Sequence, residues 1–160
     1  MITAEELREQ LDYDPKTGVF TRRASNNFAR KIGDVAGYYT DLGYRRIEIK
    51  YRSYAAHRLA WLHVYGVWPR AEIDHINSVR DDNRIANLRE ATRAENNRNA
   101  KTRRNKRCAK GVDMRRGRFR ARILAQGKSI HLGYYATEEE AHAAYVAAAE
   151  KEFGAFARAE

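Results

Sequence analysis

The chain has 160 residues, a formal net charge of +10 and a sequence pI near 9.9. This length holds one medium-sized or two small domains, and we expect two compact modules joined by a linker. The charge favours a polyanionic partner, nucleic acid first, over an acidic small molecule. No segment approaches the length and apolarity of a membrane span, and Cys108 as the single cysteine excludes an intrachain disulfide and a Cys-rich zinc site.

The first fifty residues predict short elements separated by turns. In order, we expect a helix from Thr3 through Leu11, a turn at 14–18, a strand at 19–23 and a hairpin that joins 37–39 to 44–50 across 41–43. Thr3 and Glu6 have the spacing of a capping box. The strand 44–50 alternates apolar and charged residues, and its charged face either contacts a DNA backbone or is simply solvated.

A longer helix is predicted from Ala55 to Gly66. Apolar residues recur there at three- and four-residue steps, and Gly66 with the following Trp68-Pro69 ends the pattern. His57 and His63 lie on this helix. Each is either a ligand or a packing residue, and packing is the commoner role for a lone helical histidine.

The stretch from Ile73 to Asn99 carries the strongest chemical signal. Ile73 and Ile76 bracket Asp74 and His75, which predicts a short strand with an adjacent carboxylate and imidazole. A polar loop follows, then Asn87-Leu88-Arg89. Thr92 is suited to cap a short helix whose first turn contains Asn96.

In these residues, and in His57-Arg58-Leu59-Ala60-Trp61 before them, the chain resembles the HNH homing endonucleases, whose fold is a hairpin and a helix around one divalent metal. The resemblance implies Asp74 and Asn96 as metal ligands, His75 as general base and Asn87 as the residue that holds the loop. Many members of that family have a third histidine where this chain has Asn96. We therefore expect a nuclease domain over residues 1–100 with its metal motif at 73–99.

A carboxylate and an amide oxygen form a hard ligand set, which suits one Mg²⁺ or Mn²⁺ ion better than zinc. His75, with an ordinary pKa of about 6.5, is suited to take a proton from an attacking water. Asp81 and Asp82 are the nearest rival ligands, but in a polar loop we expect them to be solvated turn residues.

A basic linker is predicted at 101–109. Between Arg98 and Arg122 there are twelve Lys and Arg residues against one acidic residue, Asp113, a density that does not form a core. The linker either lies along DNA phosphates or only aids solubility. Its expected DNA contacts are Arg103, Arg104, Lys106 and Arg107.

Residues 110–160 predict a second module of three strands and a helix. The expected strands are 111–115, 118–123 and 129–134, with turns at 116–117 and 126–128, and the helix runs from Thr137 to about Phe153 with Gly154 as its stop. In the middle strand one face is apolar and the other is cationic.

Over Lys110 to about Ala157 the chain resembles the plant APETALA-two/ethylene-response-factor DNA-binding domain, in which the sheet enters the major groove. The implied DNA contacts are Arg115, Arg116, Arg118, Arg120, Arg122 and His131. Asp113 stands where that family often has Arg, and Arg116 and His131 replace aromatic residues, so the target sequence is not carried over. Arg on such a strand reads guanine through two donors.

The fold class we expect is α+β, with the nuclease module, the basic linker and the sheet-and-helix module in that order. The predicted function is site-specific hydrolysis of double-stranded DNA, as a nick or a double-strand cut, by a monomer or weak dimer in the cytoplasm of a bacterium or phage-infected host. The alternative is a non-enzymatic DNA-binding regulator with an inactive nuclease module. An RNA-binding accessory protein is a third reading that rests on charge alone.

Overall fold

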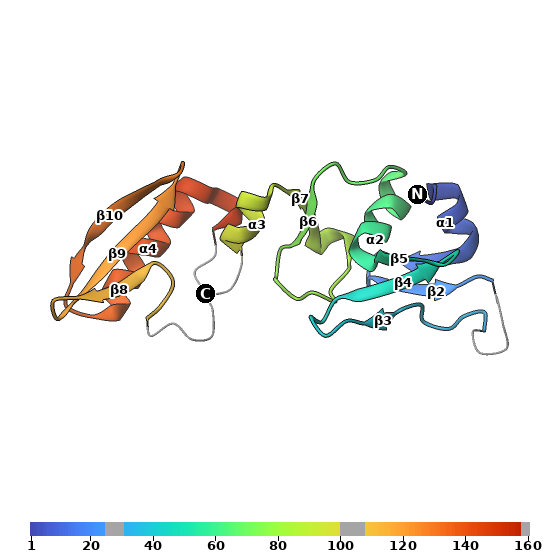
Figure 1. Cartoon of the computed structure of the whole chain (residues 1–160), viewed down its shortest axis with the longest axis horizontal. Coiled ribbons are helices and arrows are strands. Elements are labelled where there is room, and N and C mark those ends of the chain that lie inside the picture. The colour runs from blue at the N-terminus through green and yellow to red at the C-terminus, as the bar shows by residue number, and fades with distance from the viewer. Residues whose placement is uncertain (25–30, 100–107, 158–160) are drawn as a thin grey trace. The chain divides into compact units, whose positions relative to one another are not determined.

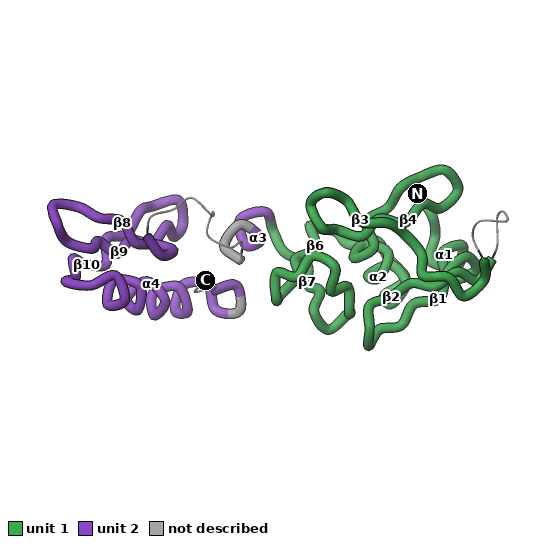
Figure 2. The backbone as a smooth tube through the Cα atoms, turned by 90° about the horizontal axis from the view of Figure 1, so that it is seen from below, with its two compact units in different colours: residues 1–92 green, residues 93–160 purple. Residues whose placement is uncertain are grey.

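The computed structural model describes residues 1–24, 31–99 and 108–157, which form an α+β fold of small antiparallel sheets and α-helices (Figure 1). The α+β class predicted from the sequence is confirmed. The chain divides into two compact units, Met1–Thr92 and Arg93–Glu160 (Figure 2). No helix within the described ranges is long and apolar enough to cross a membrane.

The first unit opens with a helix and a hairpin. Helix α1 spans Ala4–Gln10, and its N-terminus is the predicted capping box of Thr3 and Glu6. Strand β1 (Leu11–Asp14) follows at once and pairs antiparallel with β2 (Val19–Arg22). The sequence did not predict β1, because four residues carry little periodicity. Leu11 belongs to this strand, and the expected helix was therefore one residue too long.

A three-stranded sheet comes next, followed by the longest helix of this unit. Its strands are β3 (Tyr38–Tyr39), β4 (Arg45–Ile49) and β5 (Arg52–Ala55), in the order β3-β4-β5. The hairpin of β3 and β4 confirms the prediction, whereas β5 was not foreseen. Helix α2 (Ala56–Tyr65) begins directly after β5 and ends at Gly66, whose φ of 75° is the left-handed conformation expected of a helix stop.

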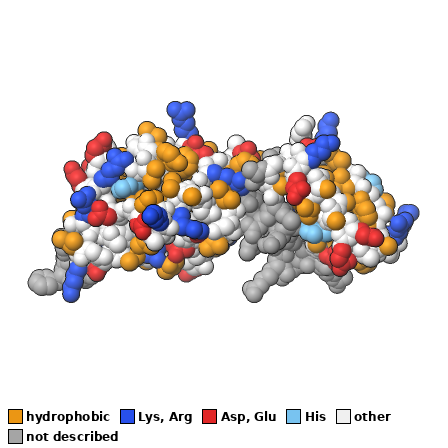
Figure 3. All heavy atoms as spheres, turned by 180° about the vertical axis from the view of Figure 1, so that it is seen from behind, with side chains coloured by type: hydrophobic (Ala, Val, Ile, Leu, Met, Phe, Trp, Pro, Cys, Tyr) orange, Lys and Arg blue, Asp and Glu red, His pale blue; other side chains and the backbone are white. Residues whose placement is uncertain are grey.

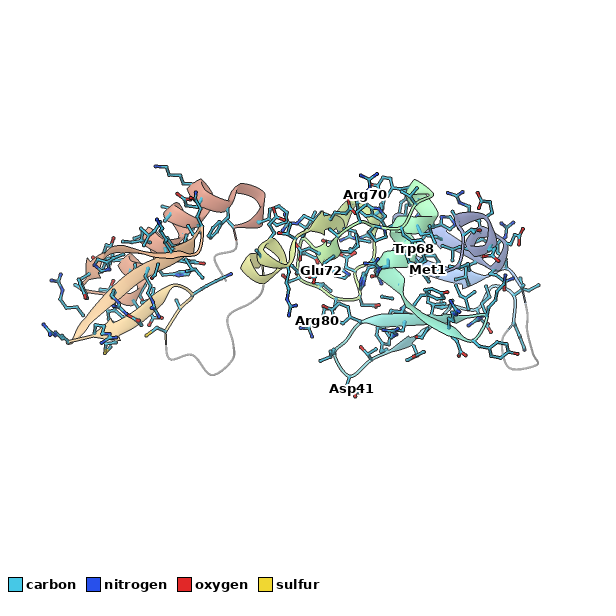
Figure 4. All side chains as sticks on the ribbon, turned by 45° about the horizontal axis from the view of Figure 1, so that its top comes forward. Met1, Asp41, Trp68, Arg70, Glu72 and Arg80 are labelled. Carbon is cyan, nitrogen blue, oxygen red and sulfur yellow. The ribbon has the colours of Figure 1, made fainter. Side chains whose placement is uncertain are left out.

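One apolar core joins these elements to the hairpin of β6 (Glu72–His75) and β7 (Leu88–Ala91). Phe20, Ile47 and Leu59 are fully buried in it, and Ile73 and Leu88 anchor the hairpin to the same cluster. Trp68 lies beside the N-terminus, where its Nε1 donates to the carbonyl oxygen of Ile2 at 3.0 Å (Figure 4). The hairpin is therefore fixed on a packed scaffold.

The loop between β6 and β7 contains a short 3₁₀ helix, η1 (Ile85–Asn87), and β7 is followed by helix α3 (Arg93–Asn99) after Thr92. The register of the hairpin pairs Asp74 with Arg89 and His75 with Leu88. The predicted strand, loop, strand and helix of the motif are all present. Helix α3 is assigned to the second unit.

The second unit is a three-stranded sheet covered by one helix. Its elements are β8 (Val112–Arg115), β9 (Arg118–Ala125), β10 (Lys128–Tyr135), α4 (Glu138–Phe153) and η2 (Gly154–Phe156). The sheet order is β10-β9-β8, and both turns have two residues at positive φ, as tight hairpin turns require. The second turn is shorter than expected because Lys128 already lies in β10. Ala141, Tyr145 and Ala149 of α4 are buried.

Candidate functional site

Asp74 and His75 lie side by side on β6, and both are almost fully buried, at 4% and 5% exposed. The Asp74 carboxylate is held from β7, where Arg89 approaches its Oδ2 with Nε at 2.9 Å and Nη2 at 2.8 Å. A buried carboxylate needs such a partner, because desolvation of an isolated charge is costly. The hairpin register places this cation directly across from the carboxylate.

The imidazole of His75 is enclosed by polar and aromatic groups. Its Nε2 lies 3.3 Å from Oδ1 of Asn83, and the ring of His57 meets it edge to face at a centroid distance of 5.1 Å. The Tyr44 ring lies 6.0 Å away. Burial lowers the pKa of His75, and the contact with Asn83 and the nearby carboxylates oppose this shift only in part. The ring is therefore neutral at physiological pH, as a general base requires.

His57 on α2 packs against this ring. Burial, and then the proximity of His75, lower the pKa of His57 to about 3. His63, the other helical histidine, packs against the rings of Tyr13 and Phe20. Of the two roles considered for these histidines, the observed contacts are those of packing residues.

Asn87 closes the loop that separates β6 from β7. Its Nδ2 donates to the Asp82 carbonyl oxygen at 2.8 Å and to Oδ1 of Asn77 at 3.0 Å, and its own Oδ1 accepts from the Asn77 backbone N–H at 3.0 Å. These contacts account for burial of a polar side chain that is only 8% exposed. The side chain thus ties both ends of the loop together.

The expectation that Asp81 and Asp82 are solvated turn residues is correct only in part, because both are partly exposed but each is bound by neighbouring side chains. Asp81 accepts hydrogen bonds from the Tyr39 hydroxyl at 2.5 Å and from Nε of Arg45 at 3.2 Å, which join the loop to the β3–β4 hairpin. Asp82 is bound by Arg84, and this pair lowers the pKa of Asp82 to about 2. Both carboxylates brace the loop, because cationic side chains lie within reach of each.

Arg80 makes a second connection between the loop and that hairpin. It points toward the turn that carries Asp41 (Figure 4), where its Nη1 donates to the Leu42 carbonyl oxygen at 2.7 Å. Its guanidinium also lies over the Tyr44 ring, 5.2 Å from the centroid. The β3–β4 hairpin is therefore tied to the loop by contacts from both Asp81 and Arg80.

The remaining predicted metal ligand, Asn96, lies in the first turn of α3, in the second unit. Among the residues that the structure describes, no group of three or more His, Cys, Asp or Glu side chains is placed to hold a metal ion. A metal site with one carboxylate and one carboxamide does not need three such side chains, because phosphate and water supply most of its ligands. The predicted linker contacts Arg103, Arg104, Lys106 and Arg107 lie outside the described residues.

The second unit presents a cationic sheet face. Strand register pairs Arg122 with His131, Arg120 with both Tyr134 and Asp113, and Arg118 with Arg115, so these side chains share the face opposite α4. Arg116 sits in the β8–β9 turn with a φ of 51°. A hollow at this end of the sheet is lined by Arg115, Arg116, Arg118, Arg120 and Tyr134.

Asp113 neutralises part of this face. Its carboxylate accepts from Nε and Nη2 of Arg120 at 2.8 and 2.6 Å, and it lies 3.5 Å from Arg122. Figure 3 shows that Lys and Arg side chains are interspersed with acidic and apolar ones on the face of the molecule that it draws. Of the three arginines on the middle strand, Arg118 and Arg122 are more exposed than Arg120.

Sequence reasoning missed three residues of the first site, namely Tyr44, Asn83 and Arg89. Arg89 was noted only as part of the motif, although its place opposite Asp74 follows from the hairpin register. Asn83 had no usable signal, because an Asn between charged loop residues looks the same whether it is buried or solvated. Tyr134 was likewise missed on the second unit, where its ring lies 4.8 Å from that of His131.

Residues 54–98 match the family model described as HNH endonuclease, and the chain therefore contains an HNH endonuclease domain over that range. The range runs from β5 into α3 and includes Asp74, His75, Asn87 and Asn96. It also crosses the boundary between the two compact units. No curated protein matches this chain.

Proposed function

We propose that this protein is a site-specific, homing-type DNA endonuclease that hydrolyses one phosphodiester bond with His75 as its general base. The observation that carries the proposal is the buried Asp74-His75 pair on a hairpin that lies within the HNH endonuclease match. A buried carboxylate beside a neutral imidazole is the pair of groups that metal-assisted hydrolysis of a phosphodiester needs.

Each residue of the site has a separate task in this proposal. His75 takes the proton from the attacking water, a contribution typically of ~10²–10⁴-fold. Arg89 orients the Asp74 carboxylate, and Asn87 holds the loop closed around the base. Because the loop is also tied to the β3–β4 hairpin through Asp81 and Arg80, the geometry around His75 is set before substrate binds.

Asp74 and Asn96 are the proposed ligands of one divalent cation. Both offer oxygen atoms, and a carboxylate already buried beside the base fits a hard cation such as Mg²⁺ or Mn²⁺. Such an ion, when bound, polarises the phosphate and carries the charge that develops on the leaving oxygen. The family match supports this set because it reaches into α3 and includes Asn96.

The second unit is proposed to bind double-stranded DNA with its cationic sheet face. Three strands on one helix, with Arg118, Arg120 and Arg122 on the outer face, support the proposed likeness to the APETALA-two/ethylene-response-factor domain. The proposed domain limits remain 1–100, 101–109 and 110–160. Arg115, Arg116 and His131 complete the proposed DNA contacts on this sheet, and the linker contacts remain part of the proposal.

A plasmid-cleavage assay with purified full-length chain and Mg²⁺ tests the enzymatic claim. Wild type should convert supercoiled plasmid to nicked circles, and to linear DNA where two chains act together. His75→Ala should lose cleavage while it retains DNA binding in a gel-shift assay. His142→Ala, on α4 of the other unit, is the control for loss of a histidine elsewhere.

Three results separate the readings of this protein. Cleavage that needs a divalent metal and is lost in His75→Ala supports the nuclease. Sequence-specific DNA binding without cleavage under Mg²⁺, Mn²⁺ or any other divalent metal supports a regulator with an inactive module. Stronger binding to A-form RNA than to duplex DNA supports an RNA-binding role.

A further inference from the structure

Asn83 is a buried polar residue to which the proposed function gives no task. It is 1% exposed, and it is the only polar side chain among the largest fully buried ones of the described residues. Buried amides that are not bonded are costly, so its partners are informative. Its Nδ2 donates to the Asp81 carbonyl oxygen at 3.2 Å, and its Oδ1 lies 3.3 Å from Nε2 of His75.

These two contacts determine which residue donates the hydrogen bond between Asn83 and His75. A backbone carbonyl oxygen only accepts, and the amide group that faces Asp81 must therefore be the NH₂. The oxygen of Asn83 then faces His75 and can only accept as well. In a neutral imidazole one nitrogen donates and the other accepts, so Nε2 carries the proton and Nδ1 carries the lone pair.

Asn83 is itself held by the N-terminal hairpin. The Tyr13 hydroxyl on β1 donates to the Asn83 carbonyl oxygen at 2.7 Å. The β1–β2 turn comes so close that a Cβ at Gly18 would lie 2.5 Å from the carbonyl carbon of Asn83. Tyr13 is fixed in turn by the Phe20 ring, with centroids 4.7 Å apart. The β1–β2 hairpin therefore packs directly against the loop at Asn83.

We propose that Asn83 is the positioning residue that holds His75 in the tautomer with the proton on Nε2, and that the β1–β2 hairpin buttresses Asn83. The inference rests on the proposed role of His75 as general base. Nδ1 is then the nitrogen that accepts the proton from water. Partners that bond to the second nitrogen of metal-binding histidines fix the tautomer and orientation of those rings, and loss of such a partner typically lowers metal affinity or activity by ~10–100-fold. We expect an effect of the same order for Asn83 and His75.

Nuclear magnetic resonance of the full chain with ¹⁵N-labelled histidine reads the tautomer directly. The His75 signals are identified by their absence in His75→Ala. In wild type we expect the protonated nitrogen to be Nε2, and in Asn83→Leu, which keeps the size but removes the acceptor, a mixture of tautomers. A wild-type His75 with its proton on Nδ1 overturns the proposal.

Single-turnover cleavage at saturating DNA gives the second readout. We expect Asn83→Leu to lower the cleavage rate by about 10–100-fold with DNA affinity unchanged, because a positioning residue acts on the chemical step. Asn83→Asp loses the donor to the Asp81 carbonyl oxygen but keeps an acceptor beside Nε2. It should therefore keep the proton on Nε2 and lose less activity than Asn83→Leu. Equal rates for wild type and Asn83→Leu contradict the inference.

Tyr13→Phe tests the buttress without touching Asn83 or the base. It removes only the hydroxyl, and we expect a several-fold lower cleavage rate with unchanged DNA affinity. Tyr38→Phe is the matched control, because the Tyr38 hydroxyl contacts Ser53 at 3.3 Å within the β3-β4-β5 sheet. If both variants cleave alike, the hairpin does not act through Asn83. Tyr13→Phe and Asn83→Asp remain informative if Asn83→Leu fails to fold.

The two proposals fail in different ways. If wild type cleaves under no divalent metal, the proposed function fails, while the tautomer spectrum still reports whether Asn83 sets the proton on His75. If wild type cleaves, His75→Ala does not, and Asn83→Leu keeps both the rate and the tautomer, then only the positioning role of Asn83 is wrong.

Discussion

His57 is partly buried and His75 is buried, and the neutral state of both imidazoles depends on desolvation. The two rings meet at 5.1 Å, and a positive charge on either one disfavours a charge on the other. Arg46 and Arg58 are the nearby cations that also lower the pKa of His57. Individual residues of the site therefore make the folded state sensitive to acid.

The first unit should lose stability as the pH falls from about 6.5 to about 3. His57 has a pKa of about 3 when folded and an ordinary value of 6.5, so between these values the unfolded chain binds a proton that the folded chain does not. The free energy of unfolding therefore rises with pH between about 3 and 6.5, and this stabilisation is lost on acidification. Urea unfolding at pH 7 and pH 4.5 measures the difference.

His57→Gln removes this titration and should flatten the dependence of unfolding stability on pH between 4.5 and 7. The control is the wild-type chain in the same buffers and at the same ionic strength. An unchanged slope in the variant would mean that other groups cause the acid sensitivity.

The loop between β6 and β7 is the element that Asn87 organises. Three hydrogen bonds of its side chain connect Asn87, at the end of the loop, to Asn77 near its start and to Asp82 in its middle. Asn87→Ala should destabilise the first unit by about 1–3 kcal/mol, because buried partners are left without their bonds. Cleavage should fall more than DNA affinity. Thermal unfolding and single-turnover rates measure the two effects.

Asn77→Ala is the comparison for this element. Asn77 is exposed and shares only part of the same network, so we expect a smaller loss of stability. If Asn87→Ala cleaves like wild type, the loop closure that it provides is not needed for the reaction.

In the second unit, α4 lies against the sheet through a close contact at Gly111. A Cβ at this position would lie 2.5 Å or less from atoms of the Tyr145 ring, and its φ of +79° is unfavourable for other residues. Gly111→Ala should therefore destabilise this unit by roughly 1–3 kcal/mol or more. Gly127→Ala is the control. Its φ of +76° is equally unfavourable for alanine, but the space around it is open, so only the strained backbone conformation destabilises this variant. Thermal unfolding that ranks both variants equally would show that packing against Tyr145 is unimportant.

Across the whole molecule, the charge of +10 predicts DNA affinity that depends strongly on salt. Arg122→Gln removes one cation from the sheet face and should reduce the slope of log affinity against log salt by about 1. Lys151→Gln removes the same charge from the last turn of α4 and should leave the slope unchanged. Titrations of a fluorescent duplex at several salt concentrations measure both. Equal slopes for the two variants would mean that the sheet is not the binding face.

Local signals made much of this fold predictable. The capping box at Thr3, the helix start at Thr137, the helix stop at Gly66 and the tight turns at Gly117 and Gly127 depend on residues a few positions apart, and the structure has them where they were expected. The short strands β1 and β5 were missed. Four residues hold too little pattern, and their strand character comes from the neighbours with which they pair.

By itself the sequence determined the α+β class and the position of Asp74 and His75 on one short strand, because periodicity, turn chemistry and motif spacing act over short distances along the chain. Only the tertiary structure decided that Arg89 holds Asp74, that Asp81 and Asp82 brace the loop, and that Asn83 lies between Tyr13 and His75. These contacts join residues far apart in the chain or buried by distant elements. Whether a polar side chain is solvated or bonded is set by the packing of the whole unit, which no local pattern encodes.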